Sequence, residues 1–303
     1  MRLGLPRPRV QRALLPYWFI VPAVVGLVLF SIYPFLSGIW YSFTSIGWVG
    51  DDAQFVGLRN YQQLWTGDVG VAKLFKESFV RSIQWTVLVV GGQFLIGLGV
   101  ALVLNERFPG RSLFRTLTML PIALPTVIMV LTWQWMYDPY YGLINHYLVQ
   151  WGLLDDPKIW VGQNDSTLWP LVVVGIWRGF PFMALMLLSG LQGIPDELYD
   201  AAKVDGAGAV ARFSHVTLPQ MRTIIGIAIM LHILWWWNHF DILLIIGAMG
   251  QQFAYGSSTL PILSWVEAFR WSHLGLGAAV SVLAMLGLGG VILWNARREL
   301  RAV

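Results

Sequence analysis

The chain has no cysteine and few charged residues. Without thiols it can form neither a disulfide framework nor a thiolate metal site. Charged residues make up 12% of the 303 positions and apolar residues 56%, with a mean hydropathy of +0.62. This balance excludes an ordinary soluble domain, which needs a far more polar surface. The phosphate-binding pattern G-x-x-x-x-G-K-[ST] is also missing from the sequence, so we expect nucleotide chemistry to lie in another polypeptide.

Long apolar runs dominate the sequence instead. A helix needs about 20 apolar residues to cross the hydrocarbon core of a bilayer. Six runs are long enough: 17–43, 82–104, 114–136, 168–190, 223–247 and 273–294. They predict an all-α integral membrane protein with six transmembrane helices. The expected plan is an N-terminal tail at 1–16, a six-span domain at 17–294 with a loop at about 191–222, and a C-terminal tail at 295–303. The first run is too long for a signal-peptide core and is expected to remain as an anchor.

Positive charge is distributed unevenly between the two sides of this plan. Thirteen Lys and Arg residues fall on one side: Arg2, Arg7, Arg9, Arg12, Arg107, Arg111, Arg115, Lys203, Arg212, Arg222, Arg297, Arg298 and Arg301. Six fall on the other: Arg59, Lys73, Lys76, Arg81, Lys158 and Arg270. The positive-inside rule therefore places both termini and the segment around Asp200 in the cytoplasm. Topology in the lipid bilayer also explains the net charge of +4, so no nucleic-acid partner is expected.

Small residues and prolines recur within the runs. Because close backbone approach holds helices together in lipid, the glycines predict helix–helix contacts. They include Gly91, Gly92, Gly97, Gly99, Gly175 and Gly179. Pro121, Pro125 and Pro181 each free a carbonyl and favour a bend.

Four polar or aromatic residues within the runs are candidates for a substrate path. An ionisable group inside a membrane costs a few kcal/mol, so Arg178 in the fourth run and Asp241 in the fifth need a purpose. They either pair with each other or face an aqueous path. Asn238 lies three positions before Asp241, which predicts a shared helix face. Trp235 opens a run of three tryptophans whose flat faces suit sugar rings, although most of the 17 Trp residues are expected at lipid or membrane interfaces.

The charged interval between the fourth and fifth runs reads "DELYDAAKVDGAGAVARFSHVTLPQ", from Asp196 to Gln220. Acidic residues at its start suit the positive end of a helix dipole. Leu198, Ala201 and Ala202 then form a narrow apolar face, and Gly206 is expected to break the helix. Since so short a helix is marginal in water, we expect it to dock into a groove on another protein.

The spacing of this interval resembles the EAA loop of ATP-binding-cassette importer permeases, E-A-A-x3-G-x9-I-x-L-P. The match runs from Asp200-Ala201-Ala202 through Gly206 to Val216-Thr217-Leu218-Pro219, with Asp for Glu and Val for Ile. The flanking "LQGIPDELYDAAKVDGAG" and "FSHVTLP", and "GLRNY" and "IWRGFPF" elsewhere, resemble the carbohydrate branch of that family. Arg222 replaces a frequent Pro, and the segment 247–259 departs from the family's Gly-Gly-Pro pattern.

The resemblance implies a permease subunit that carries a sugar or related polyol across the cytoplasmic membrane of a prokaryote. Its coupling helix would sit in a cleft of a cytoplasmic ATPase. The implied coupling residues are Asp200, Ala201, Ala202, Gly206, Leu218 and Pro219. The implied partners are a second homologous permease, two ATPase subunits and an extracytoplasmic solute-binding protein. ATP and Mg would be used by the ATPase partner, with no cofactor on this chain.

Two other classes remain as alternatives at this point. A secondary transporter or channel would work without an ATPase, but it usually shows inverted repeats, and none is evident. A membrane-embedded enzyme would need clustered His and Asp ligands. His232 and His239 lie seven positions apart and are expected in core or interfacial roles, so no metal site is predicted. The sequence leaves disaccharide, oligosaccharide and glycerol-phosphate-type solutes all open.

Overall fold

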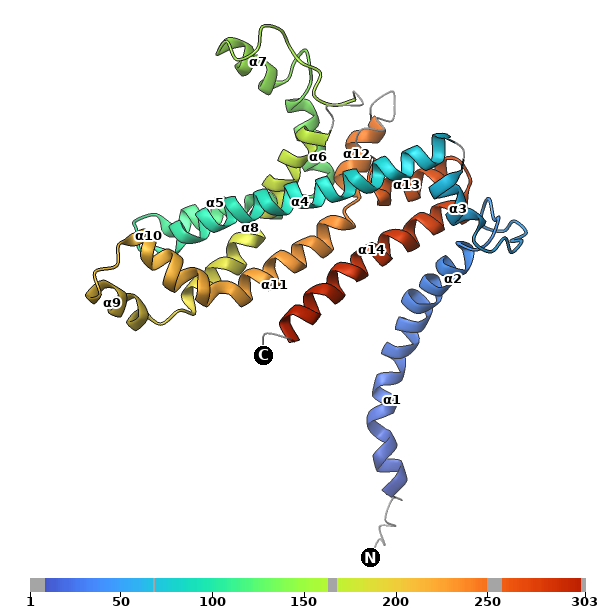
Figure 1. Ribbon diagram of the computed structural model, residues 1–303, viewed down its shortest axis with the longest axis horizontal. Coiled ribbons are helices and arrows are strands. Elements are labelled where there is room, and N and C mark those ends of the chain that lie inside the picture. Colours follow the sequence, from blue (N-terminus) through green and yellow to red (C-terminus); the bar gives the residue numbers. More distant parts are fainter. Residues whose placement is uncertain (1–8, 68, 163–167, 250–257, 301–303) are drawn as a thin grey trace, which may run out of the picture. The chain divides into compact units, whose positions relative to one another are not determined.

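The computed structural model describes residues 9–67, 69–162, 168–249 and 258–300 (Figure 1). The chain divides into two compact units, Met1–Asp68 with Ser264–Leu283, and Val69–Leu263 with Ala284–Val303. Helices dominate both units, and the extended pairing found in the described residues is a single bridge between Thr44 and Phe55. The expected all-α class is confirmed.

The first unit begins with a helix that meets no packing partner of its own. Helix α1 (Arg9–Leu27) continues through a π-helical turn at Val28–Ile32 into α2 (Tyr33–Tyr41). Its apolar stretch Trp18–Tyr41 has a mean hydropathy of 2.3, and none of its most apolar window is buried. A helix that is apolar on its whole circumference and uncovered is suited to lipid or to another subunit.

The rest of the first unit is an ordered loop held to the start of α14 (Leu274–Leu300). Helix α3 (Arg59–Thr66) contributes the buried Asn60, whose amide donates to the carbonyls of Ser42 and Thr44, both at 2.9 Å. The amides of Leu274 and Gly275 donate to the carbonyls of Gly47 and Ile46, both at 3.0 Å. The first outer loop is therefore a folded element.

A buried carboxyl also lies in this unit. Glu267, in a π-helical turn at Val266–Arg270 that follows α13 (Leu260–Trp265), is 1% exposed. Its Oε2 lies 3.1 Å from Nδ1 of His273. Burial raises the pKa of Glu267 above its ordinary value, while the hydrogen bond and charge of His273 lower it.

In the second unit, α4 (Val69–Asn105), α8 (Leu168–Gln192) and α11 (Leu218–Trp237) pack side by side (Figure 1). Helix α4 begins well before the apolar run at 82–104, so residues 69–81, expected in a loop, are helical. A Cβ on Gly175 would meet Trp85, Val89 and Trp236 at 3.0–3.2 Å. The predicted close approach is confirmed at Gly92, Gly97, Gly175 and Gly179, whereas Gly91 and Gly99 have no such neighbour within 4 Å.

The third apolar run is not one continuous helix. It divides into α5 (Arg111–Ala123) and α6 (Thr126–Met136), whose axes differ by 95°. Pro125 has no N–H to donate and disfavours the helical conformation of the residue before it, so Leu124 is extended with ψ 132°. The expected single span at 114–136 is therefore wrong in its continuity, and the predicted bend is confirmed.

The fifth run is interrupted as well. Helix α11 ends at Trp237, and α12 (Asp241–Met249) starts after a short non-helical stretch. Asn238 lies at the end of one helix and Asp241 at the start of the next, so the prediction that they share a helix face is wrong. The unusual segment at 247–259 falls mostly at 250–257, outside the described residues.

Within the described ranges, five helices are long and apolar enough to cross a membrane, or six if the bent pair α5–α6 counts as one span. Between α6 and α8 lies a small lobe around α7 (Leu143–Gln150). The buried Asn145 organises it by bonding the carbonyls of Pro139 and Lys158, the amide of Lys158 and the indole of Trp160.

Candidate functional site

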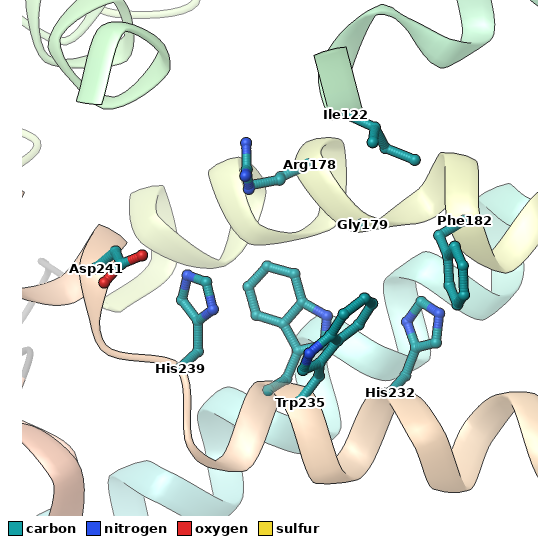
Figure 2. Close-up of a pocket in the computed structure, with 9 residues that line it drawn as sticks. Ile122, Arg178, Gly179, Phe182, His232, Trp235, His239 and Asp241 are labelled. Carbon is teal, nitrogen blue, oxygen red and sulfur yellow. The ribbon is translucent and has the colours of Figure 1, made fainter. Parts of the chain in front are cut away.

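A cavity of about 330 Å³ lies in the second unit, between α8, α11 and the start of α12 (Figure 2). Each of its walls comes from a helix end or a helix face. Its lining residues are Ile122, Arg178, Gly179, Phe182, His232, Trp235, Trp236, His239 and Asp241. Three of the four predicted path residues, Arg178, Trp235 and Asp241, are among them.

One wall of the cavity is aromatic. The rings of Phe182 and Trp235 lie 5.4 Å apart between centroids, and Phe182 stacks on His232 at 5.7 Å. The indole of Trp235 is 63% exposed, whereas Trp236 is buried against His239 at 4.4 Å. Flat apolar faces with polar groups at their edges can hold a ring that carries hydroxyls.

A buried hydrogen-bond chain supplies the polar groups of the opposite kind. Gln93 on α4 donates from Nε2 to the carbonyl of Gly175 at 2.8 Å, and its Oε1 lies 2.5 Å from Nδ1 of His232. An amide oxygen can only accept, so Nδ1 of His232 carries the proton, and in the neutral ring Nε2 is then an acceptor. Nε2 of both His232 and His239 is buried without a protein partner in the described part of the chain. The cavity wall therefore contains hydrogen-bonding capacity that a bound hydroxyl would use.

Arg178 makes its contacts on the side of α6, at the break in the third span. Nη1 lies 3.2 Å from the carbonyl oxygen of Leu124 and 3.7 Å from the sulfur of Met129, and Nη2 donates to Oγ1 of Thr126 at 2.9 Å. Within the described residues no ion pair joins Arg178 to Asp241, so the pairing considered from the sequence is not formed. The carboxylate of Asp241 is exposed at the start of α12.

Asn238 is not among the residues that line the cavity. Its amide donates to the carbonyl of Leu234 at 3.1 Å, as the end of α11. Sequence reasoning missed Phe182 and assigned His232 and His239 to core or interfacial roles. His232 is indeed 1% exposed, yet its ring faces the cavity. The available signal was its spacing to Trp235 and Trp236, at i+3 and i+4, which puts all three on one helix face.

The segment between α8 and α11 has the helix–Gly–helix form expected from the sequence. Helix α9 (Asp196–Val204) is followed by Gly206 at φ +78° and by α10 (Ala209–Arg212). The amide of Ala207 closes the end of α9 on the carbonyl of Ala202 at 2.9 Å, a pattern that needs the left-handed residue at Gly206. The hydroxyls of Tyr199 and Thr217 lie 3.0 Å apart and tie α9 to the chain that enters α11.

The predicted coupling residues lie on or beside a largely exposed surface. Asp200 and Ala201 are exposed and Ala202 is half-buried, while Asp200 accepts a hydrogen bond from Lys203 at 2.8 Å. Leu218 is half-buried and Pro219 exposed in the first turn of α11. Two large apolar side chains, Val204 and Val210, are 89% and 82% exposed. Exposed apolar groups next to a charged pair are typical of a surface that meets a partner.

Comparison with known proteins gives one consistent result. Residues 93–297 match the family model for the binding-protein-dependent transport system inner membrane component. The chain is 32% identical over 278 residues to the trehalose/maltose transport system permease protein MalF of Thermococcus litoralis, covering 92% of this chain and 91% of that protein. It is 30% identical over 283 residues to the sn-glycerol-3-phosphate transport system permease protein UgpA of Pectobacterium atrosepticum, covering 92% of each.

The fold is also shared with solved transporters. A chain of a bacterial ABC transporter involved in the import of the acidic polysaccharide alginate superposes with a TM-score of 0.82 at 18% identity, over 96% of this chain and 97% of that one. The same kind of transporter in complex with an alginate pentasaccharide-bound periplasmic protein gives 0.75. The sequence match over most of its length decides the assignment: the chain belongs to the family of binding-protein-dependent transport system inner membrane components, and it is a multi-pass permease subunit of an ABC importer, not an enzyme.

Proposed function

We propose that this permease forms half of the transmembrane path for a sugar or related polyol in an ATP-driven importer. The cavity between α8 and α11 carries this proposal, because it combines an exposed indole face with buried imidazole nitrogens that have no protein partner. Ring C–H groups would pack on Trp235 and Phe182, and hydroxyls would bond the rims. The breaks in the third and fifth spans support it too, since interrupted helices are typical of substrate sites in transporters.

The relatives point to the same chemical class. Their names give trehalose and maltose in one case and sn-glycerol 3-phosphate in another, and the solved transporters import alginate. All these solutes carry several hydroxyl groups. Inside the cavity of this chain the charges are one guanidinium and one carboxylate, which favours a solute without a phosphate group.

The proposed assembly contains this chain, a second homologous permease, two ATP-binding-cassette ATPase subunits and an extracytoplasmic solute-binding protein. The family is binding-protein-dependent by name and located in the inner membrane, which supports the last partner and a prokaryotic inner-membrane location. ATP and Mg²⁺ are bound by the ATPase subunits, and this chain holds no cofactor of its own. Both termini and the α9–α10 segment lie in the cytoplasm, as the distribution of Lys and Arg favours.

In this proposal the α9–α10 segment transmits movement between the ATPase and the spans. The alanines at 201 and 202 allow close approach to a groove, Asp200 makes a polar contact, and Gly206 sets the turn between the helices. Leu218 and Pro219 start α11, so a push on the segment reaches the helix that carries Trp235 directly. ATP binding closes the ATPase pair and turns the cavity outward, and hydrolysis resets it. The bundle is the two-state element that both ends bias.

A direct test is to purify the tagged chain from its native membrane and measure the ATPase activity of the assembly in proteoliposomes. We expect an ATPase to copurify, and its activity to rise with the cognate binding protein loaded with a neutral saccharide. A chain that transports alone, with no ATPase attached, would refute the importer assembly.

Gly206 offers a sharper test of coupling. Space around it is open, since nothing lies within 4 Å of an added Cβ, but its φ of +78° strains any β-branched residue. We expect Gly206→Val to lower the solute imported per ATP hydrolysed by about tenfold, since such strain is of order 1–2 kcal/mol. Solute uptake and phosphate release, measured together in the reconstituted complex, give this ratio.

Two controls separate strain from bulk. Gly206→Asn adds a side chain that tolerates a left-handed backbone, so it should retain most of the coupling. Gly208→Val adds the same side chain at an ordinary φ of −68°, again in open space. If Gly206→Val transports normally, the segment does not couple as proposed here.

A further inference from the structure

The break between α5 and α6 leaves backbone groups without helical partners inside an apolar span. The last carbonyls of α5 and the first amides of α6 face this need, and α6 has no side-chain cap on its first turn. In a membrane such groups must find partners within the protein. Only Leu124 and Pro125 separate the two helices, so the partner has to come from another element.

Arg178 on α8 supplies that partner from 54 positions away in the sequence. One guanidinium reaches both sides of the break, with its Nη1 at the carbonyl of Leu124 and its Nη2 at the hydroxyl of Thr126. A planar group with several fixed donors can bridge two acceptors in this way, and a Lys ammonium cannot match the geometry. A cation beside the carbonyl that follows α5 is also favoured by the dipole of that helix.

Other contacts hold the outer part of α6 without Arg178. The indoles of Trp133 and Trp177 meet edge to face at 5.8 Å, and the hydroxyl of Tyr137 donates to the carbonyl of Pro170 at 3.0 Å. Helix α6 is therefore fixed to α8 along its length, and Arg178 acts at the elbow alone. Loss of the guanidinium should loosen the elbow and leave the packing of α6 on α8 in place.

We propose that Arg178 is a positioning residue that fixes the break in the third span, and that it is not the receptor for an anionic group of the solute. Its donors are used by Leu124 and Thr126, and Ile122, next to the break, forms part of the cavity wall. The charge of Arg178 thus sets the shape of the cavity. The second half of this statement rests on the proposed function, whereas the first half concerns the fold of α5 and α6.

The elbow can be measured with two spin labels, because the natural chain has no cysteine. Leu117 on α5 and Trp135 on α6 are 53% and 75% exposed, and each is replaced by a labelled Cys in the complex in lipid nanodiscs. Electron–electron resonance then gives the distance distribution across the break. We expect one main distance with Arg178 present. In Arg178→Lys the ratio of other distances to the main one should rise by about tenfold, the factor that a hydrogen bond to a charged group commonly contributes.

Thr126 gives a matched pair of variants outside the cavity lining. Thr126→Val removes the hydroxyl at nearly constant shape and should broaden the distribution, whereas Thr126→Ser keeps the hydroxyl and should restore the wild-type width. Arg178→Lys combined with Thr126→Val should be no broader than Arg178→Lys alone, because both remove the same contact. A wild-type distribution in both Thr126→Val and Arg178→Lys would overturn the positioning role.

Inorganic phosphate, as the simplest anionic probe, tests the second half with the same readout. We expect no change in the wild-type distribution on its addition. A phosphate-dependent shift that Arg178→Lys abolishes would show an anion site at Arg178 and overturn that half. Because neither measurement requires transport, failure of the importer assignment would be seen separately, in the reconstituted ATPase experiment.

Discussion

Gln93 is the side chain that connects the helices around the cavity. It lies on α4, donates to a carbonyl of α8 and accepts from His232 on α11, and no part of it is exposed. Burying a polar amide is tolerated because both ends of it find partners. The orientation of His232, and with it the acceptor that faces the cavity, therefore depends on a residue of a different span.

Replacing Gln93 should reveal this dependence. Gln93→Leu leaves Nδ1–H of His232 buried without an acceptor, so we expect the free energy of unfolding to fall by roughly 1–3 kcal/mol. The double variant Gln93→Leu/His232→Leu removes both partners and should lose less than the sum of the two single variants. Unfolding in mixed detergent–SDS titrations measures both values. Strict additivity would mean that the two side chains do not act as a pair.

At the scale of the helices, α4 and α8 approach closely where glycine faces the partner. A Cβ on Gly179 would overlap the amide of Gln93, whereas a Cβ on Gly99 would meet nothing within 4 Å. Both residues are glycines in transmembrane helices, and only one of them is needed for contact. Glycine content alone does not distinguish them.

The two positions therefore form a matched pair of substitutions. Gly179→Ala should displace Gln93 and destabilise the bundle by roughly 1–3 kcal/mol, the usual cost of overpacking. Gly99→Ala should be neutral or slightly stabilising, because Ala favours the helix by up to about 1 kcal/mol over Gly. The same SDS titration compares them. Equal effects at the two positions would contradict the packing described for α4 and α8.

At the scale of the whole molecule, orientation in the membrane links the cavity to the ATPase. The distribution of Lys and Arg predicts that the α9–α10 segment faces the cytoplasm and the lobe around α7 faces outward. Both segments carry exposed positions: Asp205 next to Gly206, and Tyr141, which is 92% exposed.

Single cysteines in the cysteine-free chain test this orientation. A membrane-impermeant maleimide should label Asp205→Cys only in inverted vesicles and Tyr141→Cys only in intact spheroplasts. The natural chain, which has no thiol, is the background control. Labelling of Asp205→Cys from outside would place the segment on the wrong side for an ATPase and remove the proposed coupling.

The sequence by itself determined the features that depend on neighbouring residues. Apolar runs long enough for a bilayer predicted the spans because length and hydropathy are local properties. Gly206 was expected to end α9, and it does so with φ +78°, since steric limits act on one residue at a time. Pro125 likewise predicted a bend, although not its angle of 95°.

Only the tertiary structure decided which distant groups meet. Nothing near Arg178 in the sequence points to Leu124 and Thr126, and nothing near His232 points to Gln93, which lies 139 positions away. The end of α11 at Trp237 separated Asn238 from Asp241 and left Asn238 outside the cavity lining. Local steric rules fix where a helix ends, but a buried polar group takes whichever partner the packing of other helices brings within hydrogen-bonding distance.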